Sequence, residues 1–180
     1  MALLLFAPFL VGGRVLWSQD IGRVYYPVAS LLREALGTGD FSRLLWCPEL
    51  GAGFPLAADG VTTPFYPPHW PLLVLLHPAL ALTAALFAAY VASGLAMAAF
   101  VRTLGLGQAP AAVAGLVYAW SGFAVGHSVH VNVVAGLPST TLFFRNYYVG
   151  LPDELVKAAM LDGAGFWRIF WRIVLPLSTP

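Results

Sequence analysis

The sequence predicts an all-α integral membrane protein with about three transmembrane helices, a long interfacial first loop and a C-terminal amphipathic helix pair. Hydrophobic residues make up 59% of the 180 residues and charged residues only 9%. Ordinary soluble domains carry roughly 25% charged residues. The chain also contains apolar stretches near the length of about 20 residues that a helix needs to cross a bilayer.

The first two apolar stretches differ in how well their length and composition fit a transmembrane helix. Residues 1–16 are short and interrupted by Gly12, Gly13 and Arg14, so they fit a marginal span, a signal anchor or a span without its beginning. Residues 78–101 carry no charge before Arg102 and predict a complete span.

The third stretch, residues 109–135, also predicts a span, and it carries His127, His130 and Asn132 near its far end. Histidines three residues apart share a helix face and resemble a metal-binding pair. No third ligand stands at a suitable spacing, and polar residues at the end of a span more often bind a neighbouring helix. The sequence therefore predicts no metal site here.

The predicted loop, residues 17–77, interleaves prolines with tryptophan and tyrosine. These aromatic residues favour the membrane interface, so we expect the loop to lie along the bilayer surface. Within it, "YYPVASLLREALGTGD" predicts one short helix, roughly Val28 to Leu36, with Gly37 as its C-terminal cap.

Charge and cysteine content exclude some classes of protein. The net charge of +1 provides no basic face for nucleic acid. Cys47 is the single cysteine, which excludes an internal disulfide and a cysteine-built metal site.

Residues 1–134 contain an acid after the first stretch, then "YYP", "ADG", "YPPHW", "RTLGL", "YAWSGF" and "HSVHVN" in order. This order resembles the N-terminal part of YfhO-type membrane proteins of the GT-C glycosyltransferase class, which use lipid-linked sugars. The resemblance implies that Asp20 and Asp59 serve a catalytic centre. A carboxylate there would act as a general base or hold a divalent metal. The alternative is that both are solvated loop acids.

The C-terminal part, residues 137–180, changes character. Pro152, followed by two acids, predicts a helix start, and Gly163 predicts its left-handed cap. A second helix follows with apolar residues at helical spacing and Arg168 and Arg172 on another face. By pattern alone, this is an interfacial helix hairpin without a partner.

The same segment resembles the EAA loop of maltose-type carbohydrate ABC importer permeases. The residues that fall at the family's spacing, or at its upstream glutamate, are Glu154, Ala158, Ala159, Gly163, Ile173, Leu175 and Pro176. Lys157 stands where the triplet has glutamate. The resemblance implies a cytoplasmic coupling helix over residues 152–163 that docks on an ATPase subunit.

The permease resemblance also implies the chain's partners and location. It places the chain in a bacterial-type plasma membrane as a multi-pass protein. A second permease subunit and a sugar-binding protein would assemble with it. It would bind no cofactor directly and would use ATP through the ATPase.

The two resemblances conflict in topology. An external first loop places the C-terminal segment outside, whereas ATPase coupling requires it inside. We therefore expect a fusion or truncation with a junction near residues 132–139. Three functions stay open: a carbohydrate importer permease component, a glycosyltransferase fragment, or an inactive membrane fragment. Whether the chain is an enzyme is not decided by the sequence.

Overall fold

The computed structural model describes the chain apart from residues 1–5, 7, 10, 13, 19, 60, 63, 151, 152, 175 and 177–180. Within the described residues every regular element is a helix, with one isolated bridge between Cys47 and Phe54. The predicted all-α class is confirmed. The chain divides into two compact units, Met1–Phe143 and Phe144–Pro180.

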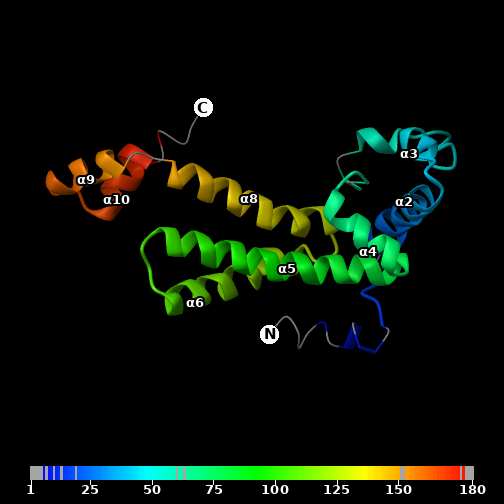
Figure 1. Cartoon of the computed structure of the whole chain (residues 1–180), viewed down its shortest axis with the longest axis horizontal. Coiled ribbons are helices and arrows are strands. Elements are labelled where there is room, and N and C mark those ends of the chain that lie inside the picture. Colours follow the sequence, from blue (N-terminus) through cyan, green and yellow to red (C-terminus); the bar gives the residue numbers. More distant parts are fainter. Residues whose placement is uncertain are drawn as a thin grey trace. The chain divides into compact units, whose positions relative to one another are not determined.

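The elements follow one another in chain order (Figure 1). The first unit contains η1 (Ile21–Tyr25), α2 (Tyr26–Thr38), α3 (Ser42–Leu45), η2 (Leu56–Ala58), η3 (Pro67–His69), α4 (Trp70–Leu75), α5 (Pro78–Thr103), α6 (Gln108–Ala119) and α7 (Gly122–Gly126). Helix α8 (Val131–Val149) begins in the first unit and ends in the second. The second unit also contains α9 (Asp153–Leu161), α10 (Phe166–Ile169) and η4 (Phe170–Val174).

The predicted second span corresponds to one long helix, α5. It has 26 residues, with Pro78 in its first turn and Arg102 in its last. At 1.5 Å per residue it is about 39 Å long, enough to cross roughly 30 Å of hydrocarbon. Among the described residues, the segments long and apolar enough to cross a membrane are Pro78–Thr103 and Gln108–Gly126.

Helices α5 and α6 form a close-packed hairpin. A Cβ added to Gly115 would lie 2.5 Å from the carbonyl oxygen of Gly94, and a Cβ at Gly94 would lie 3.2 Å from the carbonyl oxygen of Gly115. Two glycines facing each other let the helix backbones approach closely, as is common between membrane helices.

The predicted third span, residues 109–135, is not one helix. Helix α6 ends at Ala119. Ser121, whose backbone is extended, is the N-cap of α7, and its hydroxyl oxygen accepts a hydrogen bond from the Ala124 amide at 3.3 Å. A second turn over residues 127–130 separates α7 from α8. Serine caps a new helix because its side chain satisfies a free amide of the first turn. Helix α8 then runs unbroken through the junction predicted at residues 132–139, with Pro138 inside it.

The long loop folds onto α5. Its buried residues Tyr25, Val28, Leu32, Leu44 and Leu56 belong to the same hydrophobic core as Leu82 and Leu86 of α5. The predicted short helix is α2, which extends two residues further at each end than expected.

The cap predicted at Gly37 is wrong, because Gly37 lies inside α2. Gly39 is the cap: its φ is 76°, and its amide donates to the Ala35 carbonyl at 2.8 Å. Gly37 and Gly39 lie close together in the sequence, but only position 39, with its positive φ, requires a glycine.

The predicted first span, residues 1–16, lies partly outside the described residues. Its described residues contact α5. Phe6 is buried, with its ring 5.7 Å from that of Phe87 and 5.8 Å from that of Tyr90. The Leu16 amide donates a hydrogen bond to Thr83 Oγ1 at 3.0 Å.

Candidate functional site

The first of two candidate sites lies where the beginning of the long loop meets the start of α8. Asp20 Oδ2 lies 3.2 Å from His130 Nε2, and both side chains are a little under half exposed. The Tyr25 hydroxyl donates to Asn132 Oδ1 at 2.5 Å. Two polar contacts therefore join segments more than 100 residues apart in the sequence.

The pKa of the Tyr25 hydroxyl is raised. Burial is the main cause, and the negative charges of Asp20 and Asp59 add to it, while the hydrogen bond with Asn132 opposes them. Tyr25 therefore stays protonated at neutral pH and acts as a hydrogen-bond donor. Asp20 and Asp59, predicted separately from the sequence, both lie within electrostatic range of this one hydroxyl.

Asp59 is engaged in a local turn. Its carboxylate accepts hydrogen bonds from the Val61 amide at 3.0 Å and from the Thr62 hydroxyl at 2.7 Å. Partial burial raises the pKa of Asp59, but these hydrogen bonds outweigh it, so the net pKa is lowered. An ionised carboxylate that accepts local donors is a common turn device, and its catalytic role stays a prediction.

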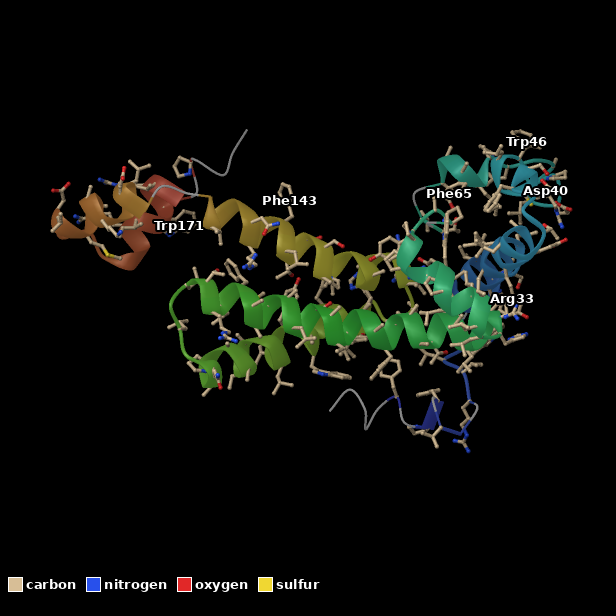
Figure 2. The ribbon with its side chains drawn as sticks, in the orientation of Figure 1. Arg33, Asp40, Trp46, Phe65, Phe143 and Trp171 are labelled. Carbon is tan, nitrogen blue, oxygen red and sulfur yellow. The ribbon has the colours of Figure 1, made fainter. Side chains whose placement is uncertain are left out.

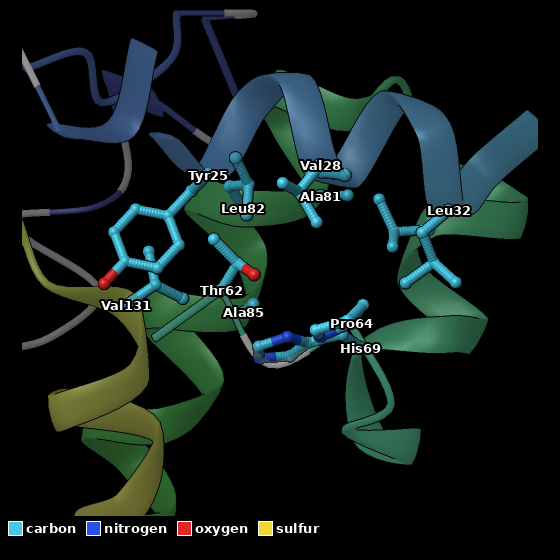
Figure 3. Close-up of a pocket in the computed structure, with 12 residues that line it drawn as sticks. Tyr25, Val28, Leu32, Thr62, Pro64, His69, Ala81, Leu82, Ala85 and Val131 are labelled. Atoms are coloured by element: carbon cyan, nitrogen blue, oxygen red, sulfur yellow. The ribbon is translucent and has the colours of Figure 1, made fainter. Parts of the chain in front are cut away.

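A small cavity of about 20 Å³ lies beside Tyr25, with room for about one water molecule. Its polar lining comes from Tyr25, Thr62 and His69, and the rest is apolar (Figure 3). Burial lowers the pKa of His69 to about 4, so this imidazole is neutral at physiological pH. The cavity is too small for a sugar or a lipid carrier.

The histidine pair in the turn between α7 and α8 contacts its neighbours. The His127 ring stacks on Phe123 with centroids 4.2 Å apart, and its centre lies 5.6 Å from that of His130. In the part of the chain that the structure describes, no group of three or more His, Cys, Asp or Glu side chains is arranged to hold a metal ion.

The second candidate site is the elbow between α9 and α10. Gly163 has a φ of 73° and donates its amide to the Met160 carbonyl at 3.0 Å, while the Ala164 amide donates to the Ala159 carbonyl at 2.9 Å. These two bonds form the Schellman motif that ends a helix with a left-handed glycine. The cap predicted at Gly163 is confirmed.

The surface of α9 around this elbow is open. Glu154, Lys157 and Ala158 are exposed, and Ala159 is half-buried. Met160 and Leu161 are 61% and 89% exposed.

Beyond the elbow, Ile169 of α10 is buried and Ile173 is half-buried, while Arg168 and Arg172 are exposed. This agrees with the predicted apolar face for the residues that can be described. Pro176 is exposed, and Leu175 lies outside the described residues.

Sequence reasoning missed Tyr25 as a functional candidate. The residue stands in the quoted "YYP", but its partner Asn132 is 107 positions away. No local spacing could have paired them.

A family model described as "Binding-protein-dependent transport system inner membrane component" matches residues 3–180. This match runs through the region expected to be glycosyltransferase-like and through the expected junction. It gives no support to the YfhO-type resemblance or to a fusion.

Several curated permeases are similar over short segments. A "Probable ABC transporter permease protein" of Pyrococcus horikoshii is 58% identical over 43 residues, 24% of this chain and 16% of the relative. The xylose/arabinose import permease protein XacI of Haloferax volcanii is 44% identical over 52 residues, 29% of this chain and 17% of the relative. The sn-glycerol-3-phosphate transport system permease protein UgpE of Yersinia enterocolitica is 58% identical over 40 residues, 22% of this chain and 14% of the relative.

The chain spans about a sixth of the length of the curated relatives it matches. No solved structure matches it.

Proposed function

Because the chain belongs to the binding-protein-dependent transport system inner membrane component family, we propose that it is part of the permease of a carbohydrate ABC importer. The observation that carries this proposal is the family match over residues 3–180. The similar permeases named for xylose/arabinose and sn-glycerol-3-phosphate favour a sugar or a polyol phosphate as substrate. In this role the chain crosses the inner membrane more than once and assembles with a second permease subunit and a substrate-binding protein.

The elbow of α9 and α10 is the surface proposed to dock on the ATPase subunit. An ATPase that closes on nucleotide binding must push on a rigid element for its motion to reach the membrane helices. The Schellman bonds at Gly163 fix the direction in which the chain leaves α9. Ala158 and Ala159 have small side chains, which permit close approach, and the exposed Met160 and Leu161 provide apolar area for a partner.

Lys157 affects the strength of this docking. It is exposed on α9 where the resembled pattern has glutamate. A reversed charge at an interface changes association rate and partner choice more than the geometry of the complex. We expect the cognate ATPase to carry an acidic side chain, in place of a basic one, opposite this position.

Site-specific cross-linking tests the proposal. Ala158→Cys in a Cys47→Ser background places one thiol on α9, and a bifunctional reagent then links it to the ATPase subunit of a carbohydrate importer from the same organism. The matched control is Thr38→Cys in the same background, at an exposed position at the end of α2. We expect a cross-link at position 158 whose yield changes on adding ATP, and none at position 38. Equal yields at both positions would refute the docking role.

Uptake identifies the substrate class. Membrane vesicles that contain the complete importer are loaded with ATP and offered radiolabelled pentoses, disaccharides and glycerol phosphate. Accumulation of one of these compounds, lost when the chain is removed, supports carbohydrate import. Accumulation of none of them would refute it.

A further inference from the structure

The long loop carries three exposed apolar side chains at the end of α3 and on the short hairpin that follows it. Leu45, Trp46 and Phe54 are 60%, 56% and 42% exposed, and together they form what we name the hairpin patch. Paired backbone hydrogen bonds between Cys47 and Phe54, 2.8 and 2.9 Å long, close the hairpin. The Trp46 indole lies against Gly53 and leaves no room there for a Cβ. The three side chains thus stand on adjoining segments of a defined structure.

Three of the charged groups beside the patch are paired with one another, and a fourth, Asp40, accepts a hydrogen bond from the Ser42 amide at 2.9 Å. Arg43 contacts Glu34 at 3.2 Å and Glu49 at 2.6 Å. The Cys47 thiol donates a further hydrogen bond to Glu49 at 3.2 Å. Charges that are already paired and hydrogen-bonded cost less to move into a region of lower dielectric constant.

The hairpin is tied to the level at which α5 begins. Arg43 is paired with Glu34 of α2. The preceding residue of α2, Arg33, donates from Nη1 to the carbonyl of Leu76, which lies two residues before α5 begins at Pro78. Figure 2 shows Arg33 at the end of α5 where that helix starts, and Trp46 farther from α5, at the outer edge of the loop. Val74 and Leu75 of α4, the short helix that precedes α5, are also exposed, at 59% and 78%.

We propose that the hairpin patch inserts into the headgroup region of the bilayer, on the side where α5 begins. Tryptophan is enriched at this depth because its ring is apolar and its N–H finds polar partners there. The occupant is lipid because the hairpin is linked through α2 to the start of a membrane-spanning helix of the same compact unit. Inserted in this way, the hairpin anchors the first loop to the membrane surface. The proposal requires only that α5 spans the bilayer and does not depend on carbohydrate transport.

Spin labels measure the depth directly. The full chain, carrying Trp46→Cys in a Cys47→Ser background, is labelled with a nitroxide and reconstituted in phosphatidylcholine–phosphatidylglycerol vesicles. Oxygen, which concentrates in lipid, and a nickel chelate, which stays in water, are compared as relaxing agents. Leu45→Cys provides a second patch position, and Thr38→Cys is the exposed polar control on the same loop.

We expect the ratio of oxygen to nickel accessibility to be higher at positions 45 and 46 than at position 38. Equal ratios at all three positions would overturn the proposal, since the patch would then face water. Low accessibility to both agents at positions 45 and 46 would also overturn it, because protein would then cover the patch. Unchanged helical circular dichroism identifies variants that have kept the fold. Using two patch positions keeps the test decisive if one variant does not fold.

Discussion

Replacing Gly163 by alanine tests whether the elbow between α9 and α10 depends on left-handed backbone geometry. Gly163 has a φ of 73°, and apart from its chain neighbours no atom of the described residues lies within 4 Å of the Cβ that alanine would add. The cost is therefore backbone strain alone, about 1–2 kcal/mol for an L-residue in this region. A penalty of this size increases local opening of the elbow by a factor of about 5–30.

Hydrogen exchange measures this opening at two amides. The Gly163 amide is bonded to the Met160 carbonyl, and the Ala164 amide to the Ala159 carbonyl. Both positions should exchange faster in Gly163→Ala. Gly163→Asn should recover part of the protection, because asparagine tolerates the left-handed region better than alanine.

Gly165→Ala is the matched control. Gly165 also has open space around its Cβ position, but its φ lies outside the positive range. We expect Gly165→Ala to keep the amide protection of the original chain or to raise it by no more than about 1 kcal/mol, since its main effect is to reduce the backbone entropy of the unfolded chain. Equal effects of the two alanine variants, or no effect of Gly163→Ala, would refute the reasoning.

Three further predictions concern the first unit. Tyr25→Phe removes the hydrogen bond to Asn132 and should lower the free energy of unfolding by about 0.5–1.5 kcal/mol in thermal denaturation, with Tyr26→Phe as the control. Gly115→Ala places a Cβ 2.5 Å from the Gly94 carbonyl oxygen and should cost about 1–3 kcal/mol, whereas Gly122→Ala, with open space, should not. His69 has a folded-state pKa lowered from 6.5 to about 4, so the unfolded state binds a proton first as pH falls. Stability should therefore decrease from about pH 6.5 toward pH 4, by up to about 3 kcal/mol, and His69→Gln should remove this dependence.

The features that the sequence predicted correctly are local. Helix α5 follows from a long apolar run that begins at a proline and carries no charge until Arg102. The cap at Gly163 follows from a glycine between two periodic segments, and the structure places it in the left-handed region. Propensity and periodicity act over a few residues, so they are readable in the chain itself.

The features that the sequence did not predict depend on distant contacts or on a choice between similar residues. The helix break at Ser121 divides residues 109–135, whose apolar composition predicted a single span. Gly37 and Gly39 are both glycines near the end of α2, and only the positive φ of Gly39 identifies it as the cap. The contact between Tyr25 and Asn132 joins segments 107 residues apart, so it needed the fold.

The side of the membrane on which the C-terminus lies tests the proposed function most directly. A reporter fused after Pro180 and active only in the cytoplasm is compared with one active only outside, each on the full chain. The account predicts activity of the cytoplasmic reporter alone, because an ATPase subunit can reach α9 only from the cytoplasm. Activity of the external reporter alone would contradict the coupling role of Gly163 and its neighbours.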